Sequence, residues 1–170
     1  MDLKDYIRSI KDYPKKGILF RDITTLIKNE TAFEESINQI VERSKKYKID
    51  KIAAIESRGF VFASAVSYIL KKPFIMLRKK NKLPADVHSV DFELEYGTAT
   101  IEVHKDSISE NDSVLIIDDL IATGGTAEAA AKLVEISKGN IAAFIFVINL
   151  FDLGGCDNLC LLYTSPSPRD

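Results

Sequence analysis

The sequence predicts an α/β fold, a parallel sheet flanked by helices on both faces, with a small antiparallel extension. Short apolar stretches at residues 51–55, 74–77, 114–117 and 141–148 alternate with stretches that favour helix, as in repeated strand–helix–strand units. The last of them is apolar throughout, which is typical of a parallel strand buried on both faces. Because ligands of such folds bind beyond the carboxyl ends of the strands, the residues that follow each stretch are the first candidates for a site.

Three helices are expected in order along the chain. Thr31 and Glu34 have the spacing of a capping box, and apolar residues follow them at helical intervals, which predicts a helix over 31–47. A second helix is expected over 59–70, where it stops before a proline. A third is expected over 127–138, an alanine-rich stretch that is followed by a glycine.

The antiparallel extension is expected over residues 90–103. Apolar side chains alternate on either side of Gly97, as in two half-exposed strands joined by a turn. The composition, 46% apolar and 28% charged, is that of an ordinary globular protein, and we expect one domain over residues 1–159. Residues 160–170 end in a polar stretch with two prolines, and we expect them to form a disordered tail.

Charge and hydropathy exclude several classes of partner. The 23 basic and 25 acidic residues leave a net charge of −2, which provides no overall attraction for nucleic acid or for an anionic membrane surface. No apolar run is long enough to cross a bilayer. The charged start lacks the apolar centre of a secretory signal, so the expected location is cytoplasmic. The CxxxC spacing of Cys156 and Cys160 could start a metal site, but no second pair of cysteines or histidines lies near it in the sequence, so two free thiols are expected.

A glycine-rich turn follows the apolar stretch at 114–117 and leads into a predicted helix. Two glycines let backbone N–H groups converge, the flanking threonines add hydroxyl donors, and a helix start carries partial positive charge. The turn therefore has the parts of a phosphate site, in residues Ala122, Thr123, Gly124, Gly125 and Thr126. The alternative is structural: Thr126 would cap the helix and the glycines would form a tight turn with no ligand.

Two adjacent acids favour the functional interpretation of this turn. Asp118 and Asp119 directly follow the apolar stretch, where they repel each other and resist desolvation, so folding alone gives little reason for them. A polyhydroxyl ligand or magnesium would account for both. No lysine follows the glycines as in a P-loop, and no GxGxxG follows a strand, which excludes the common ATP and dinucleotide motifs.

The stretch 114–126 resembles the phosphoribosyl pyrophosphate motif of the type I phosphoribosyltransferases. Four further segments are similar, in order, to segments of the adenine phosphoribosyltransferases of that family, at 14–23, 56–60, 77–84 and 94–97. The resemblance covers about residues 5 to 159. It implies a homodimeric purine-salvage enzyme that forms AMP and pyrophosphate from adenine and phosphoribosyl pyrophosphate with Mg²⁺.

The resemblance also implies roles for the residues of the predicted phosphate site. Asp118 and Asp119 would hold the ribose hydroxyls of the donor, and residues 122–126 would surround its 5-phosphate. Arg58 would contact pyrophosphate, in a turn where Glu56–Ser57 forms a non-proline cis bond. No residue is expected to be a firm direct ligand of Mg²⁺, which the donor would hold, with the two aspartates nearby.

Further roles are implied outside that turn. Lys79 and Lys82, in a basic cluster, would lie near pyrophosphate, across a dimer interface. Glu95 would lie near the purine and Tyr96 on a loop that closes over the reacting centre. Main-chain groups near Leu19 and Arg21 would read the purine edge. Without the resemblance, the basic residues, Arg58 included, would be interpreted as solvated surface charges and the glutamate as an exposed strand residue.

Two alternatives to this assignment stay open at the level of sequence. The chain could act on another base, such as hypoxanthine, xanthine or orotate, although segments 20–22 and 94–97 favour adenine. It could also be a transcriptional regulator that binds phosphoribosyl pyrophosphate, since the fold occurs in such proteins. The sequence contains no appended DNA-binding helices and no strongly basic face that would support the second alternative.

Overall fold

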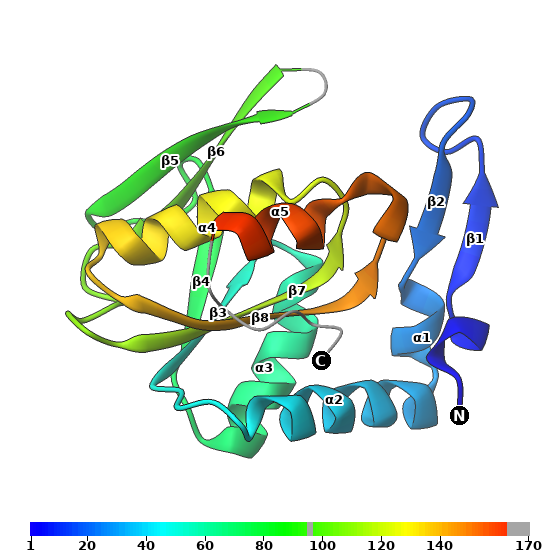
Figure 1. Ribbon diagram of the computed structural model, residues 1–170, viewed down its shortest axis with the longest axis horizontal. Coiled ribbons are helices and arrows are strands. Elements are labelled where there is room, and N and C mark those ends of the chain that lie inside the picture. The colour runs from blue at the N-terminus through cyan, green and yellow to red at the C-terminus, as the bar shows by residue number, and fades with distance from the viewer. Residues whose placement is uncertain (95–96, 163–170) are drawn as a thin grey trace. The chain divides into compact units, whose positions relative to one another are not determined.

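The computed structural model describes residues 1–94 and 97–162 (Figure 1). The chain divides into two compact units, residues 1–43 and the residues from 44 onward. Within the described residues, no helix combines the length and the apolar character needed to span a membrane.

The first unit contains a two-stranded antiparallel sheet that the sequence analysis did not predict. A 3-10 helix, η1 (Leu3–Tyr6), precedes β1 (Arg8–Lys11), which pairs with β2 (Leu19–Asp22). Helix α1 (Thr24–Lys28) follows directly. Both strands are four residues long and mix polar with apolar side chains, so they lack the alternation from which a strand can be predicted.

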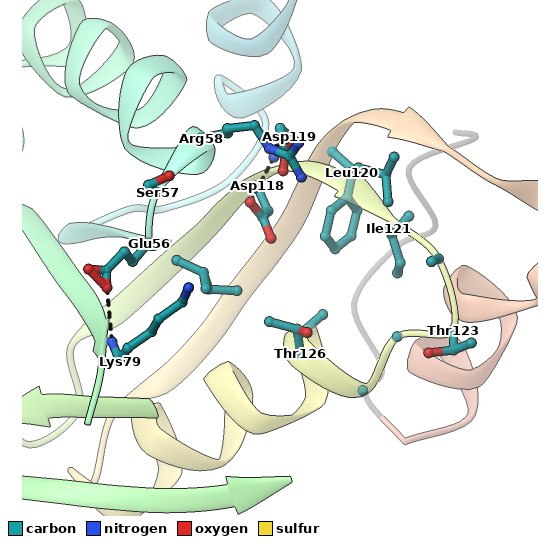
Figure 2. Close-up of a pocket in the computed structure, with 16 residues that line it drawn as sticks. Glu56, Ser57, Arg58, Lys79, Asp118, Asp119, Leu120, Ile121, Thr123 and Thr126 are labelled. Carbon is teal, nitrogen blue, oxygen red and sulfur yellow. Dashed lines mark hydrogen bonds and ion pairs between the residues drawn. The ribbon is translucent and has the colours of Figure 1, made fainter. Parts of the chain in front are cut away.

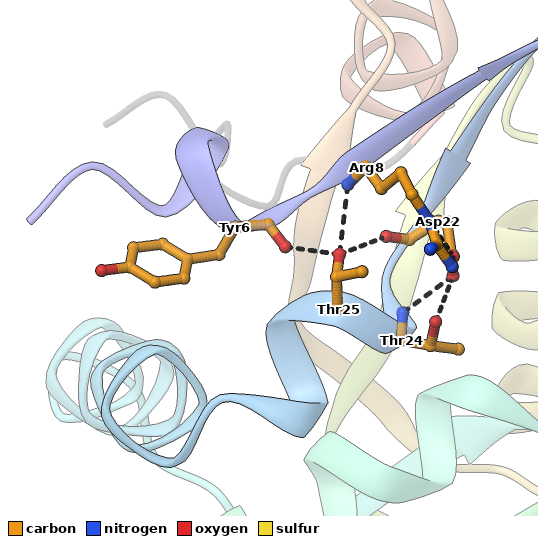
Figure 3. A network of polar contacts seen from close by, with 5 residues as sticks. All are labelled: Tyr6, Arg8, Asp22, Thr24 and Thr25. Atoms are coloured by element: carbon orange, nitrogen blue, oxygen red, sulfur yellow. Dashed lines mark hydrogen bonds and ion pairs between the residues drawn. The ribbon is translucent and has the colours of Figure 1, made fainter.

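A network of hydrogen bonds around Asp22 ties this sheet to α1 (Figure 3). The Asp22 carboxylate accepts from the Arg8 guanidinium, from the Thr24 amide at 3.0 Å and from the Thr24 hydroxyl at 2.6 Å. The Thr25 hydroxyl accepts from the Arg8 amide at 3.1 Å and donates to the Tyr6 carbonyl at 2.6 Å. The bonds from Thr24 and Arg8 lower the pKa of Asp22 to about 2, because they stabilise its charged form.

Helix α2 (Glu30–Ser44) corrects the predicted bounds at both ends. The Asn29 side chain accepts a hydrogen bond from the Ala32 amide at 2.9 Å, so Asn29 occupies the capping role that the sequence analysis gave to Thr31. The helix ends at Ser44 rather than at residue 47. Its predicted apolar face is confirmed, since Ile37, Ile40 and Val41 are buried.

The second unit is built on a six-stranded sheet in the order β5-β6-β4-β3-β7-β8. Four neighbouring strands, β4-β3-β7-β8, are parallel, whereas β6 runs antiparallel to both β4 and β5. The predicted parallel sheet and its antiparallel extension are both confirmed. The strands are β3 (Lys51–Ile55), β4 (Phe74–Lys79), β5 (Val87–Leu94), β6 (Gly97–His104), β7 (Ser113–Ile121) and β8 (Asn140–Asn149).

Helices cover both faces of this sheet, as predicted (Figure 1). Helix α3 (Arg58–Leu70) packs on β3 and β7 from one face, and α4 (Gly125–Ile136) contacts β5 and β8 from the other. Strand β7 lies at the centre of the core, where residues 114–117 are fully buried. It continues to Ile121 rather than ending at 117, so the two adjacent aspartates lie within the strand.

A final 3-10 helix, η2 (Phe151–Leu153), leads into helix α5 (Gly155–Leu162) on the same face as α4 (Figure 1). Cys156 and Leu159 are buried in the core that α4 also joins. Helix α5 includes residues 160–162, at the start of the segment predicted to be a tail. Residues 163–170 lie outside the described residues.

Candidate active site

A cavity of about 460 Å³ opens at the carboxyl ends of β3 and β7 (Figure 2). This is the edge of the sheet where a parallel α/β fold binds its ligands. The cavity is entirely within the second unit. Its lining combines residues 55–58 after β3, Lys79 at the end of β4, residues 118–127 and Phe146.

Asp119 forms an ion pair at one side of the cavity. Its Oδ2 lies 2.8 Å from the Nε of Arg58, and the carboxylate is buried whereas the arginine side chain is half exposed. Figure 2 shows the two side chains directed toward each other. Arg58 is the first residue of α3, so the ion pair joins the start of that helix to the centre of β7.

The carboxyl group of Asp118 is much harder to ionise than an ordinary aspartate. Burial and the adjacent Asp119 carboxylate raise the pKa of Asp118 to about 8, because both disfavour a second negative charge. Its Oδ1 accepts a hydrogen bond from the Asp119 amide at 2.8 Å. The raised pKa favours the protonated carboxyl group of Asp118 in the ligand-free protein, and this form can donate to a hydroxyl as well as accept from one.

The raised pKa of Asp118 predicts a stability that depends on pH. Between its ordinary pKa of 3.8 and about 8 the folded state binds a proton that the unfolded chain releases, so the free energy of unfolding falls as pH rises. Each pKa unit corresponds to about 1.4 kcal/mol. Asp118→Asn should therefore be more stable than the parent at pH 8, by an amount that shrinks toward pH 4.

Urea unfolding of the ligand-free protein at several pH values measures this difference. Asp106→Asn, at an exposed position away from the cavity, is the matched control and should parallel the parent. A constant gap between Asp118→Asn and the parent across this pH range would contradict the assignment of the proton to Asp118.

The glycine-rich turn forms the wall opposite these acids and leads into α4. Gly124 is the N-cap of α4 and has a φ of 93°, a left-handed conformation that glycine adopts without strain. No side chain caps the helix, and Thr126 lies within its first turn. The predicted role of Thr126 as the cap of this helix, one part of the structural alternative, is therefore wrong. The first N–H groups of the helix lack intrahelical acceptors, and residues 125–127 line the cavity.

Gly59 is a site residue to which the sequence analysis gave no role. A Cβ atom at this position would lie 2.8 Å from the Oδ1 of Asp118 and 3.3 Å from the carbonyl oxygen of Ile117. Glycine thus allows the start of α3 to pack directly against the carboxylate. Only the spatial approach of α3 to β7 reveals this requirement, because the two segments are far apart in the sequence.

The turn between β3 and α3 is held by Glu56. The peptide bond between Glu56 and Ser57 is cis, as the resemblance implied. Glu56 accepts from the Arg78 guanidinium at 3.0 Å and from the Lys79 amide at 3.2 Å. Burial opposes ionisation of Glu56, but these hydrogen bonds and the two cations outweigh it and lower its pKa. The carboxylate therefore fixes the end of β4, where Lys79 faces the cavity.

Comparison with known proteins identifies the kind of enzyme that this cavity belongs to. Residues 22–150 match a phosphoribosyl transferase domain. The adenine phosphoribosyltransferase of Pelagibacter ubique is 86% identical over 159 residues, which are 94% of this chain and 91% of that protein. The chain belongs to the adenine phosphoribosyltransferase family.

Solved structures of the family have the same fold. The adenine phosphoribosyltransferase of Thermoanaerobacter pseudethanolicus is 46% identical and superposes with a TM-score of 0.90, covering 92% of this chain and 91% of that one. The Saccharomyces cerevisiae enzyme, complexed with D-2,5-dideoxy-2,5-imino-altritol 1,6-bisphosphate and adenine, is 36% identical with a TM-score of 0.87 and 92% coverage of both chains.

The residues assigned by resemblance to the adenine phosphoribosyltransferase family fall into four groups. Arg58, Lys79, both aspartates and residues 122–126 line the cavity together. Lys82 does not line it. Leu19 and Arg21 lie on β2 in the first unit, where Leu19 is 46% exposed and the Arg21 guanidinium donates to the Ser9 hydroxyl. Glu95 and Tyr96 lie outside the described residues.

Proposed function

We propose that this cavity binds phosphoribosyl pyrophosphate and that the enzyme there joins adenine to the donor's ribose 5-phosphate, releasing pyrophosphate and forming AMP for purine salvage. The observation that carries the proposal is that a phosphate-binding feature and a ribose-binding feature line the same cavity. A glycine-rich helix start suited to phosphate faces a pair of acids suited to ribose hydroxyls. The two features are joined by only two residues, Leu120 and Ile121, so one ligand that carries both groups can contact them at once.

Each group of cavity residues has a part in this proposal. Asp118 and Asp119 bind the ribose hydroxyls, and residues 122–126 bind the 5-phosphate. Arg58 and Lys79 face the pyrophosphate, whose charge grows as the anomeric C–O bond breaks and the sugar becomes oxocarbenium-like. Fixed cations that face a developing negative charge lower the barrier because they need no reorganisation during the reaction. The ion pair with Asp119 holds Arg58 in place.

The residues around the cavity fit a magnesium ion carried by the donor. Among the described residues, no group of three or more histidine, cysteine or acidic side chains could hold a metal ion by itself. Asp118 and Asp119 offer carboxylate oxygens, the ligand type that Mg²⁺ prefers together with substrate phosphates. When bound, Mg²⁺ would neutralise charge on the departing pyrophosphate.

Recognition of adenine is proposed to lie with main-chain groups near Leu19 and Arg21. The match to the general phosphoribosyl transferase domain begins at Asp22, so these residues precede the part shared across that domain. This supports a role in choosing the base rather than in binding the donor. The network around Asp22 anchors the end of β2 to α1 and to β1, which would keep the reading groups in place.

Glu95, together with Tyr96 and Arg58, completes the proposed catalytic set. Glu95→Gln should lower kcat about a hundredfold or more, the scale of a lost proton-transfer group, because the role proposed for Glu95 lies with the purine. The dissociation constant of phosphoribosyl pyrophosphate should change less than about twofold, because the role proposed for Glu95 lies with the purine and not with the donor. Steady-state kinetics and calorimetry measure the two quantities.

The neighbouring Glu93 offers a matched control for this substitution. Its side chain is exposed on β5, so Glu93→Gln should leave kcat close to that of the parent. Equal kcat values for Glu95→Gln and Glu93→Gln would remove Glu95 from the catalytic set.

We also propose that the enzyme works as a cytoplasmic homodimer without nucleic-acid or membrane partners. Lys82 is exposed and outside the lining of the cavity in its own chain, which suits a residue that acts across a dimer interface. The net charge of −2 favours neither nucleic acid nor an anionic membrane surface.

Release of pyrophosphate from phosphoribosyl pyrophosphate tests the proposed function. With Mg²⁺ present, release should require adenine and should be accompanied by an equal amount of AMP. Release without any base, or no release with adenine, would contradict the proposal.

A further inference from the structure

The segment that follows β8 runs along the outside of the glycine-rich turn. The Leu150 amide donates to the Ile121 carbonyl at 3.0 Å, and the Gly155 amide donates to the Ala122 carbonyl at 3.0 Å. One turn further along α5, the Asn158 side-chain amide donates to the Thr123 carbonyl at 3.3 Å. The carbonyl groups of Ala122 and Thr123 in the turn are thus both bonded from α5.

Gly155 lies so close to this turn that no side chain would fit. A Cβ atom there would lie 2.4 Å from the Ala122 oxygen and 2.9 Å from the Gly124 nitrogen. In the other direction, a Cβ atom at Gly124 would lie 3.0 Å from the Gly155 oxygen. The two glycines therefore pack backbone against backbone, and any side chain at residue 155 must displace the turn or α5.

Helix α5 cannot easily move aside to make that room. Cys156 is 3% exposed and Leu159 is 4% exposed, and both belong to the core cluster that contains Ala127 and Ala131 of α4. Such closely packed side chains transmit a displacement instead of absorbing it. A substitution at Gly155 would therefore act mainly on the turn.

The direction of these hydrogen bonds determines which groups of the turn are presented to a ligand. In a trans peptide the C=O and N–H point to opposite sides. Since the Ala122 and Thr123 carbonyls point toward α5, the amides of Thr123 and Gly124 point away from it, and both residues line the cavity. Amides directed in this way are donors for a phosphate.

We infer that Gly155 and Asn158 are positioning residues for donor binding: they hold the carbonyls of residues 122–123 so that the amides of the turn face the 5-phosphate. The inference rests on the proposed function, because it takes the 5-phosphate as the ligand of this turn. Neither residue touches the substrate. Their effect should fall on the 5-phosphate and not on the pyrophosphate, which is proposed to face Arg58 and Lys79 instead.

Calorimetric titrations with ribose 5-phosphate and, separately, with pyrophosphate and Mg²⁺ test this inference. Gly155→Ala should weaken binding of ribose 5-phosphate at least tenfold and Asn158→Leu about threefold, the scale of one lost or displaced hydrogen bond. Pyrophosphate binding should stay within about twofold. Gly154→Asn is the control, because Gly154 has open space and a φ of 70° that asparagine tolerates.

The outcomes separate this inference from the proposed function. If Gly155→Ala fails to fold, Asn158→Leu decides the question, because Asn158 is exposed and its substitution leaves the core intact. Unchanged binding of ribose 5-phosphate in the folded variants, or equal weakening for both ligands, would overturn the inference alone. A parent protein that binds no ribose 5-phosphate would overturn the proposed function as well.

Discussion

Replacing Asp118 and Asp119 together with asparagine is expected to lower kcat/KM for phosphoribosyl pyrophosphate by about 10² to 10⁴. Each acid is proposed to bind a ribose hydroxyl. A hydrogen bond to a charged group such as Asp119 contributes roughly 1.5–3 kcal/mol, and leaving a buried polar partner unsatisfied costs about 1–3 kcal/mol. The substitution also removes the ion-pair partner of Arg58, which would loosen the cation that faces pyrophosphate. Steady-state assays of pyrophosphate release with the donor varied measure the change.

A matched double variant separates the site from the overall charge of the protein. Asp106→Asn with Glu110→Gln likewise replaces two acidic side chains by amides, at exposed positions outside the cavity, and its kcat/KM should equal that of the parent. A loss of similar size in both double variants would attribute the effect to net charge and not to the cavity.

Asp118 is expected to lower the stability of the ligand-free protein although ligand binding requires it. The pKa of about 8 at Asp118 reflects a charge that the folded protein resists, and Asp118→Asn alone is expected to stabilise the ligand-free protein. The same substitution removes a ligand of the ribose. A residue that lowers stability in the absence of ligand and is required for binding is typical of a functional site.

The enzyme should prefer adenine to hypoxanthine by about 10² to 10⁴ in kcat/KM. A main-chain carbonyl near Leu19 or Arg21 is proposed to accept from the exocyclic amine of adenine, and an N–H to donate to the neighbouring ring nitrogen. Hypoxanthine presents the opposite order at both positions, so two main-chain groups covered by the bound base would lack partners, at roughly 1–3 kcal/mol each. The ratio of kcat/KM for the two bases measures this preference.

Variants at β2 test whether main-chain groups read the base. Leu19→Val keeps the backbone groups and should keep the preference. Arg21→Pro removes the N–H and fixes φ, so it should reduce the preference. A ratio near one in the parent would contradict recognition of adenine, and an unchanged ratio in Arg21→Pro would exclude that amide from it.

The sequence allowed the layers of the second unit to be predicted because its strands are apolar and its helices periodic. The hairpin of β1 and β2 could not be predicted from local patterns. It is held together by the hydrogen bonds around Asp22 and by the pairing of Arg8 with Asp22 across the two strands. The helix start at Glu30 was misplaced by one residue because two residues with capping side chains, Asn29 and Thr31, compete there. The local sequence pattern does not determine which of these two residues caps the helix.

The candidate site was predictable as far as its residues adjoin one another in the sequence. Residues 118–126 form a continuous motif at the carboxyl end of one strand. Ligands of parallel α/β folds bind at that end, so a shared site for these residues could be predicted. Gly59 and Gly155 were not predicted to support it, because their importance comes from atoms of segments about 30 to 60 residues away. Close backbone approaches of this kind leave no periodic signal in a sequence.

The dissociation constant of phosphoribosyl pyrophosphate in the presence of Mg²⁺ tests the central claim most directly. Calorimetry should give an affinity at least about a hundredfold weaker for Asp118→Asn with Asp119→Asn than for the parent. The variant Asp106→Asn with Glu110→Gln should bind as the parent does. Equal affinities for the parent and the cavity variant would contradict the assignment of this cavity to the donor.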